Sequence, residues 1–117
     1  MVKRERVRKA IEKSIKHWEE IFDTVYACYM CTIGLNEMII DYKSSGCPLC
    51  KLFNNCCSYD KCPISKYSGD TGCANTPWVF VNKYYSTYRP PLNLVEAVEE
   101  EVKFLYKIEK LYKEGKL

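Results

Sequence analysis

The sequence lacks two features that would place the protein outside the cell or in a membrane. Its first 16 residues are rich in charge and hold no apolar core of the kind that a secretory signal peptide needs. The longest stretch without charge, 24–36, has 13 residues, whereas a membrane-spanning helix needs about 20. We therefore expect an intracellular protein that has no membrane partner.

Catalytic signatures are also scarce. The chain has a single histidine, His17, and shows neither a serine, histidine and acid grouping nor a glycine-rich phosphate loop. His17 lies at the edge of an apolar stripe, where histidine is more often a packed side chain than a catalyst. It can also replace a thiolate as a metal ligand. The sequence therefore leaves enzymatic activity undecided and favours a protein without one.

Two long segments show helical periodicity, which predicts a mainly α-helical domain. Apolar residues recur at steps of three or four in a first helix that starts near Val7 and in a last helix. Asn93 and Glu96 have the spacing of a capping box at the start of that last helix. We expect the two helices to pack together. Their predicted buried stripes consist of Val7, Ile11, Ile15, Trp18, Phe22 and Val25, and of Leu94, Val98, Val102, Leu105, Ile108 and Tyr112.

The segments between these helices are less regular. Residues 25–42 are apolar on nearly every side, which predicts a second helix or a continuation of the first beyond a bend near Gly34, although periodicity does not exclude strands. A short helix is predicted from Pro77 to about Tyr85, with Thr76 as its cap. A strand is the alternative there, because aromatic and β-branched residues are frequent.

A chain of 117 residues has the usual size of one domain. We divide it into an N-terminal helical region (1–43), a cysteine-rich loop (44–76) and a C-terminal helical region (77–117). A loop of about 30 residues without a core of its own is uncommon unless cross-links or a bound metal replace hydrophobic burial. The loop is expected to fold over one end of the packed helices.

The eight cysteines can supply that cross-link or metal site. Cys47-Pro48-Leu49-Cys50 has the spacing of a zinc knuckle, although Lys51 stands where a glycine is usual. Zinc and a [4Fe-4S] cluster each take four ligands. Cys62-Pro63 is a pair found in iron–sulfur ligand runs, and the glycine of Gly72-Cys73 permits a close backbone approach. The predicted ligands of zinc or the cluster are Cys47, Cys50, Cys62 and Cys73.

Disulfides or buried thiols are the alternative for the same cysteines. Two-residue spacings in an intracellular protein favour a metal or redox role, except in hyperthermophiles, where intracellular disulfides are common. Cys28 and Cys31 form a further pair on a predicted helix, where packing in apolar surroundings is the favoured interpretation. No βαβ pattern surrounds either pair, which disfavours a thioredoxin-like site.

Short motifs spread over most of the chain occur together in one known group of proteins. In order they are His17-Trp18-Glu19, Cys47-Pro48-Leu49-Cys50, Lys61-Cys62-Pro63-Ile64, Thr71-Gly72-Cys73, Thr76-Pro77-Trp78 and Glu100-Glu101-Val102-Lys103-Phe104-Leu105. This order resembles small uncharacterised cysteine-rich proteins of bacteriophages and other prokaryotic viruses. Those proteins usually carry a second cysteine pair, whereas Tyr59 stands here at the position of its first member. The resemblance implies a viral origin, a place in the host cytoplasm and the same four thiols, but no activity.

Positive charge is concentrated near the start of the chain. Residues 3–16 hold seven lysines and arginines against two glutamates. A helical face that carries Arg4, Arg8, Lys9 and Lys16 can contact nucleic-acid phosphates. A solvated helical surface is the other interpretation and is slightly favoured, because only the placement of charge motivates the nucleic-acid contact.

The favoured function is a small viral metal-stabilised binding module, with nucleic acid as the first partner to test and a host or viral protein as another. One alternative is an iron–sulfur protein with a redox or enzymatic role. The other is a disulfide-stabilised structural or interaction protein of a hyperthermophilic virus. Metal analysis of anaerobically purified protein separates the three functions. The binding module is expected to contain zinc, the iron–sulfur protein to contain iron, and the disulfide-stabilised protein to contain no metal.

The cysteine assignment predicts unequal effects of replacing cysteine by serine. Loss of any of Cys47, Cys50, Cys62 or Cys73 should lower the free energy of unfolding by several kcal/mol, because metal affinity is coupled to folding. Replacement of Cys28 or Cys31 should lower it much less. Chemical denaturation of the six variants measures this difference, and equal losses at all six positions would contradict the ligand assignment.

Overall fold

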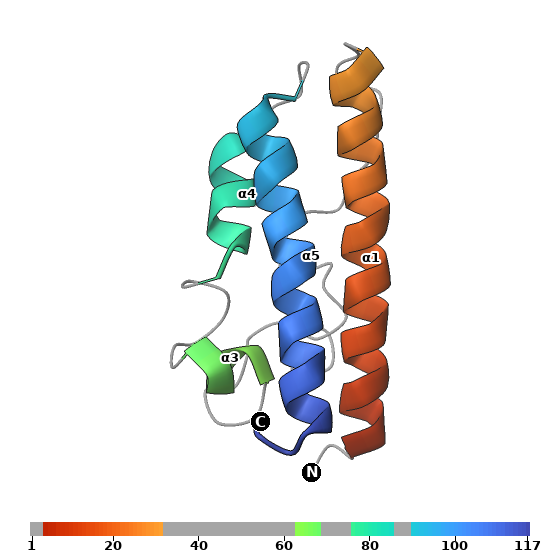
Figure 1. Cartoon of the computed structure of the whole chain (residues 1–117), viewed down its shortest axis with the longest axis vertical. Coiled ribbons are helices and arrows are strands. Elements are labelled where there is room, and N and C mark those ends of the chain that lie inside the picture. The colour runs from red at the N-terminus through yellow and green to blue at the C-terminus, as the bar shows by residue number, and fades with distance from the viewer. Residues whose placement is uncertain (1–3, 32–62, 69–75, 86–89) are drawn as a thin grey trace.

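The computed structural model describes residues 4–31, 63–68, 76–85 and 90–117, and these residues form four α-helices and no strand. In chain order the helices are α1 (Arg4–Cys31), α3 (Pro63–Ser68), α4 (Trp78–Tyr84) and α5 (Leu92–Lys113) (Figure 1). The predicted mainly α-helical class is confirmed. The strand alternative for residues 77–85 is wrong, because α4 occupies that segment.

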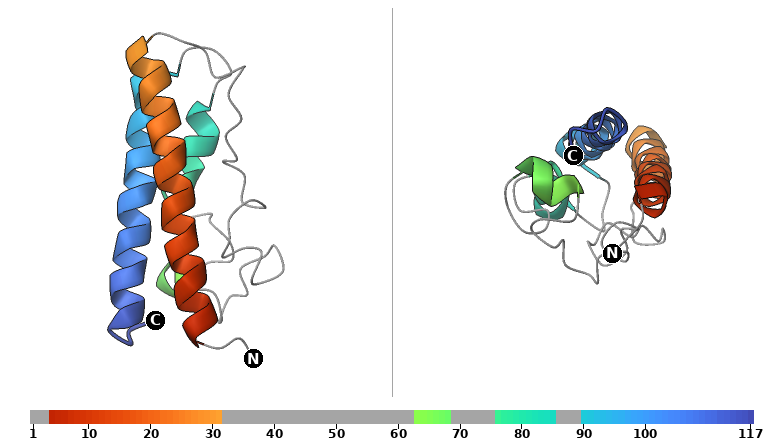
Figure 2. Two further views of the ribbon diagram at one scale, coloured as in Figure 1. Left: turned by 90° about the vertical axis from the view of Figure 1, so that its right-hand side faces the viewer. Right: turned by 90° about the horizontal axis from the view of Figure 1, so that it is seen from below.

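α5 is the central helix, and it contacts α1, α3 and α4. α1 lies along α5 in the opposite direction, so the first turn of α1 and the last turn of α5 lie at the same end of the molecule (Figure 1). α4 packs beside the first half of α5, and α3 lies beside its second half, both away from α1 (Figure 2). The predicted packing of the first and last long helices is therefore confirmed.

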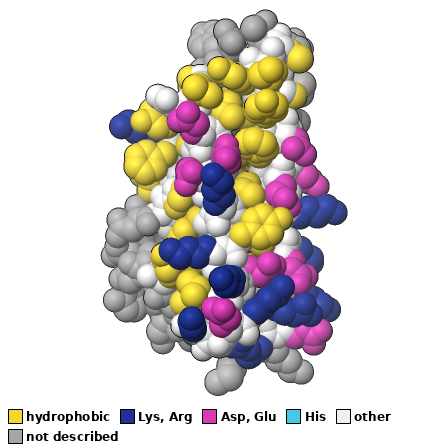
Figure 3. All heavy atoms as spheres, in the orientation of Figure 1, with side chains coloured by type: hydrophobic (Ala, Val, Ile, Leu, Met, Phe, Trp, Pro, Cys, Tyr) yellow, Lys and Arg dark blue, Asp and Glu magenta, His cyan; other side chains and the backbone are white. Residues whose placement is uncertain are grey.

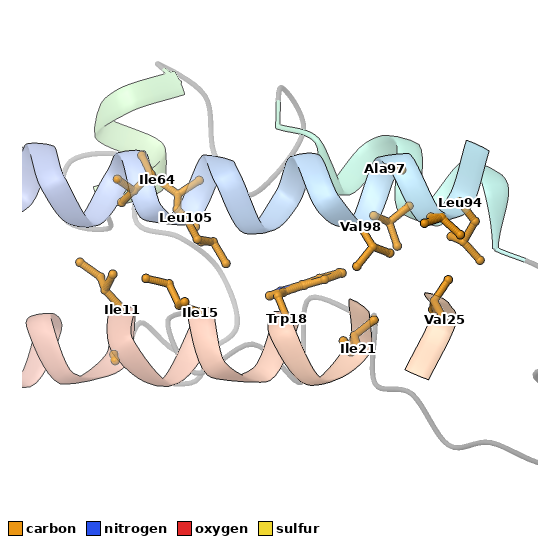
Figure 4. Close-up of a cluster of buried hydrophobic side chains, with 14 of the residues drawn as sticks. Ile11, Ile15, Trp18, Ile21, Val25, Ile64, Leu94, Ala97, Val98 and Leu105 are labelled. Atoms are coloured by element: carbon orange, nitrogen blue, oxygen red, sulfur yellow. The ribbon is translucent and has the colours of Figure 1, made fainter. Parts of the chain in front are cut away.

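The contact between α1 and α5 is a mainly apolar seam with the alternating four- and three-residue steps of a heptad pattern. Trp18 points toward α5 between Val98 and Leu105, and Ile64 of α3 lies next to Leu105 (Figure 4). Full burial of one such side chain contributes about 1.5–3 kcal/mol, so the seam is a main source of stability. Its residues are Val7, Ile11, Ser14, Trp18, Ile21, Val25 and Cys28 in α1, and Leu94, Val98, Glu101, Leu105, Ile108 and Tyr112 in α5.

Two polar residues occupy seam positions that apolar periodicity does not identify. Ser14 and Glu101 are buried, whereas Phe22 and Val102, which the pattern predicts to be buried, are only half-buried. The Ser14 hydroxyl donates a hydrogen bond of 2.8 Å to the carbonyl of Ala10, which satisfies it inside the helix. The position of a residue on the heptad therefore decides its burial here more than its hydrophobicity does.

Both predicted helix caps are wrong. α5 begins at Leu92, one residue before Asn93, with Pro91 at the N-cap and no side-chain cap. The extended backbone of Pro91 instead presents its carbonyl to the amides of Leu94 and Val95. In α4, Pro77 takes the N-cap position in place of Thr76, again without a side-chain cap.

The middle of the chain is described only in part. α1 continues through Val25 as far as Cys31, which confirms a continuation of the first helix up to that residue. α3 is a short helix within the predicted loop 44–76, and the pattern does not predict it. The rest of that loop and the predicted bend near Gly34 lie outside the described residues. Within the described ranges, no helix has both the length and the apolar character needed to cross a membrane.

Candidate functional site

The four predicted metal ligands, Cys47, Cys50, Cys62 and Cys73, lie outside the described residues. Among the residues that are described, no three or more histidine, cysteine, aspartate or glutamate side chains come together as a metal site. The assignment of zinc or a [4Fe-4S] cluster therefore continues to rest on the cysteine motifs.

The remaining candidates from the sequence lie on α1. Cys28 is 2% exposed and belongs to the hydrophobic core, as the packing interpretation predicts, whereas Cys31 is exposed. His17 is half-buried, and its ring meets the Trp18 ring edge to face at 6.1 Å between centroids. This contact agrees with the expected packing role of the histidine.

The antiparallel packing brings two basic segments together at one end of the molecule. We name this end the basic pole and define it as residues 4–16 of α1 and residues 107–117 at the end of α5. It carries ten lysines and arginines against four glutamates, a net charge of +6. Figure 3 shows most of the lysine and arginine side chains of this face in its lower half. The basic residues are Arg4, Arg6, Arg8, Lys9, Lys13, Lys16, Lys107, Lys110, Lys113 and Lys116.

The opposite end of the same helix pair is acidic. Residues 17–31 and 92–106 carry seven carboxylates against one lysine, a net charge of −6. Each long helix therefore changes the sign of its charge along its length. Because the two helices run in opposite directions, the changes reinforce each other.

Arg4 belongs to the basic pole and also helps to hold α1 and α5 together. Its guanidinium donates a hydrogen bond of 2.7 Å to the carbonyl of Tyr112 and lies 4.3 Å from the centre of the Tyr112 ring. The Tyr112 hydroxyl donates in return to the carbonyl of Arg4 at 3.3 Å. These contacts fasten the first turn of α1 to the last turn of α5, so Arg4 has a structural role that its position off the apolar stripe does not reveal.

Of the other three predicted phosphate contacts, Lys9 and Lys16 are exposed and Arg8 is half-buried. Arg8 pairs with Glu12 at 3.0 Å, and Lys9 pairs with Glu5 at 3.8 Å, both along the exposed surface of α1. Lys16 is exposed and forms no ion pair with the described residues. Exposed pairs of this kind contribute only about 0.3–0.5 kcal/mol each, so a phosphate can readily replace the carboxylate.

The lysines of α5 are the functional candidates that the sequence interpretation missed. Lys110 forms no ion pair with the described residues, Lys113 pairs with Glu109 at 3.7 Å, and Lys107 lies 4.8 Å from the centre of the Tyr67 ring. Their late position on the last helix is visible in the sequence. Combining it with antiparallel packing would have placed them beside the start of α1.

A shallow cleft crosses the junction of the two helices at the basic pole. It has a volume of about 390 Å³ and is lined by Arg4, Glu5, Arg8, Tyr112 and Lys113. Three of these five residues are cations, so the cleft is suited to an anionic group.

Comparison with known proteins does not assign the chain to a family. No family model matches the chain, and no curated protein or solved structure matches it.

The contacts of Arg4 predict that it stabilises the protein while its neighbour Arg6 does not. Arg4→Gln should lower the free energy of unfolding by about 1 kcal/mol, because it removes a hydrogen bond and a cation–π contact. Arg6→Gln makes the same change of charge at an exposed residue and should stay within about 0.5 kcal/mol of the parent protein. Urea denaturation of the two variants measures the difference, and equal midpoints would show that the contacts of Arg4 contribute nothing.

Proposed function

We propose that this chain is a small, metal-stabilised binding module of viral origin whose basic pole binds the phosphate backbone of nucleic acid. The observation that carries this proposal is the convergence of the two basic segments of α1 and α5 at one end of an antiparallel pair. Lysine and arginine side chains that replace counterions along the backbone supply most of the affinity of sequence-independent binding.

The placement of charge along α1 does not stabilise that helix through its dipole, which supports a ligand-binding role for the basic residues at its start. The amino end of a helix carries a partial positive charge, so cations there weaken the helix by about 0.3–1 kcal/mol each. Arg4 and Arg6 lie in the first turn of α1 with only Glu5 as an acidic neighbour, and its last turn holds no basic residue. The dipole of α1 alone would favour the reverse arrangement, and for Arg4 the contact with the Tyr112 carbonyl in the last turn of α5 offsets this cost. An anionic partner at this end would offset the unfavourable charge.

The residues of the basic pole have different roles in this proposal. Lys9, Lys16, Lys110 and Lys113 are the exposed phosphate contacts, and Arg8 lines the cleft between the helices. Arg4 fastens the two helices to each other, which keeps both sets of cations at the same end of the molecule. The metal that we propose at Cys47, Cys50, Cys62 and Cys73 stabilises the fold and takes no part in the contact.

Salt dependence of binding tests the proposal. The parent protein should bind labelled single- or double-stranded nucleic acid at about 50 mM salt and release it steeply as salt rises. Lys9→Gln with Lys16→Gln should reduce the slope of log affinity against log salt by about one to two units, because two phosphate contacts are lost. Lys110→Gln with Lys113→Gln should do the same. Fluorescence anisotropy measures these slopes.

A matched control removes two lysines away from the basic pole. Lys83→Gln with Lys103→Gln makes the same change of net charge on α4 and on the acidic end of α5, and it should leave the slope within error of the parent value. An equal reduction by all three pairs would mean that net charge alone drives binding. No binding at low salt by the metal-loaded parent protein would refute the proposal.

A further inference from the structure

A groove lies between α1 and α5 at the acidic end, away from the basic pole. It has a volume of about 370 Å³ and is lined by Glu19, Phe22, Asp23, Glu99, Val102, Lys103 and Tyr106. The half-buried side chains of Phe22 and Val102 form its apolar floor. Glu19 and Asp23 stand on the α1 side, and Glu99 stands on the α5 side.

The walls of the groove are held by two polar contacts. The Tyr106 hydroxyl donates a hydrogen bond of 3.0 Å to Glu19, which links the two helices and raises the pKa of the tyrosine above its usual 10.0. The Lys103 ammonium lies 3.1 Å from Glu99, and this contact raises the pKa of the lysine above its usual 10.5. The lining thus holds three carboxylates and one ammonium. That ammonium pairs with Glu99 and with Glu100 at 3.6 Å, and Asp23 forms no ion pair with the described residues.

Exposed apolar side chains extend the floor toward the end of the helix pair. On α1, Tyr26 is 46% exposed and Met30 is 60% exposed, and on α5, Leu92 is 48% exposed. Figure 3 shows hydrophobic side chains gathered over the upper ends of α1 and α5, with acidic side chains next to them. From Glu19 to Met30 this surface extends about 17 Å along α1, which is about three helical turns.

The shape and charge of this surface select one kind of partner. A channel between two antiparallel helices accepts a third helix, whose apolar side chains lie at steps of three or four. The carboxylates on both walls require that these apolar residues be flanked by lysine or arginine. A second copy of the described helices meets this requirement poorly. The apolar residues beside the basic side chains of α1, such as Val7 and Ile11, are buried in its own seam, and α4 offers a single lysine, Lys83, beside its exposed apolar side chains.

We propose that the groove between α1 and α5 is a docking site for an amphipathic helix of a partner protein, with an apolar stripe that covers Phe22 and Val102 and basic flanks that pair with Glu19, Asp23 and Glu99. The site is separate from the basic pole. Binding there does not depend on the proposed nucleic-acid function.

A synthetic peptide of about 14 residues, four helical turns, is the probe. It contains only leucine and lysine, with leucine at helical spacing, and a second peptide has the same composition with leucine on all sides. The striped peptide should bind the parent protein at least about tenfold more tightly than the scrambled one, because only it offers an apolar face to the floor. Fluorescence anisotropy gives both affinities, and amide shifts in ¹H–¹⁵N spectra should map the striped peptide to the groove.

Charge reversal tests the walls. Asp23→Lys with Glu99→Lys should weaken the striped peptide about tenfold. Glu20→Lys with Glu114→Lys makes the same change of net charge outside the groove and should weaken it less than about threefold. Equal weakening by both pairs, or equal binding of the two peptides, would overturn the proposal. Self-association of the parent protein that the groove variant abolishes would also overturn it, because a second copy would then be the occupant.

Discussion

The heptad seam between α1 and α5 is the constraint on which the rest of the described structure depends. It fixes both the direction and the register of the two long helices, with Val25 beside Leu94 at one end and Arg4 bonded to Tyr112 at the other (Figure 4). A shift by one heptad would move the helices by about 10 Å and expose apolar residues at both ends. α3 and α4 then pack on the side of α5 that the seam leaves uncovered. The positions of all surface charges on the helix pair follow from this register.

The antiparallel direction that the seam imposes determines where the positive and negative charges of the two helices lie. A parallel arrangement would place the basic start of α1 beside the acidic start of α5, and the two would largely neutralise each other. The antiparallel arrangement separates a pole of +6 from an end of −6 on one helix pair. The two ends therefore attract ligands of opposite charge, which is why we propose a phosphate backbone for one and a basic helix for the other. In both proposals, seam contacts such as those of Trp18 position charged groups that lie far from one another in the sequence.

The helices and their pairing could be predicted from the sequence because both depend on local periodicity, which is strong from Val7 to Val25 and from Leu94 to Tyr112. The burial of individual residues could not be predicted in the same way. Ser14 and Glu101 are polar, and they are buried because they occupy heptad positions that face the other helix. The basic start of α1 was readable as a run of charge. The lysines of α5 could be assigned to the same end of the molecule only once the register of the two helices was known. The structural role of Arg4 also depends on that register, because its contact with Tyr112 joins residues 108 positions apart in the sequence.

The central claim is that one surface, assembled from both ends of the chain, binds nucleic acid. Titration of the ¹⁵N-labelled, metal-loaded protein with a short oligonucleotide tests it directly, because each backbone amide reports on its own surroundings. We predict that the shifted amides fall in residues 4–16 and in residues 107–117 together. Shifts in α1 alone, or shifts centred on α4 and the acidic end, would contradict the account.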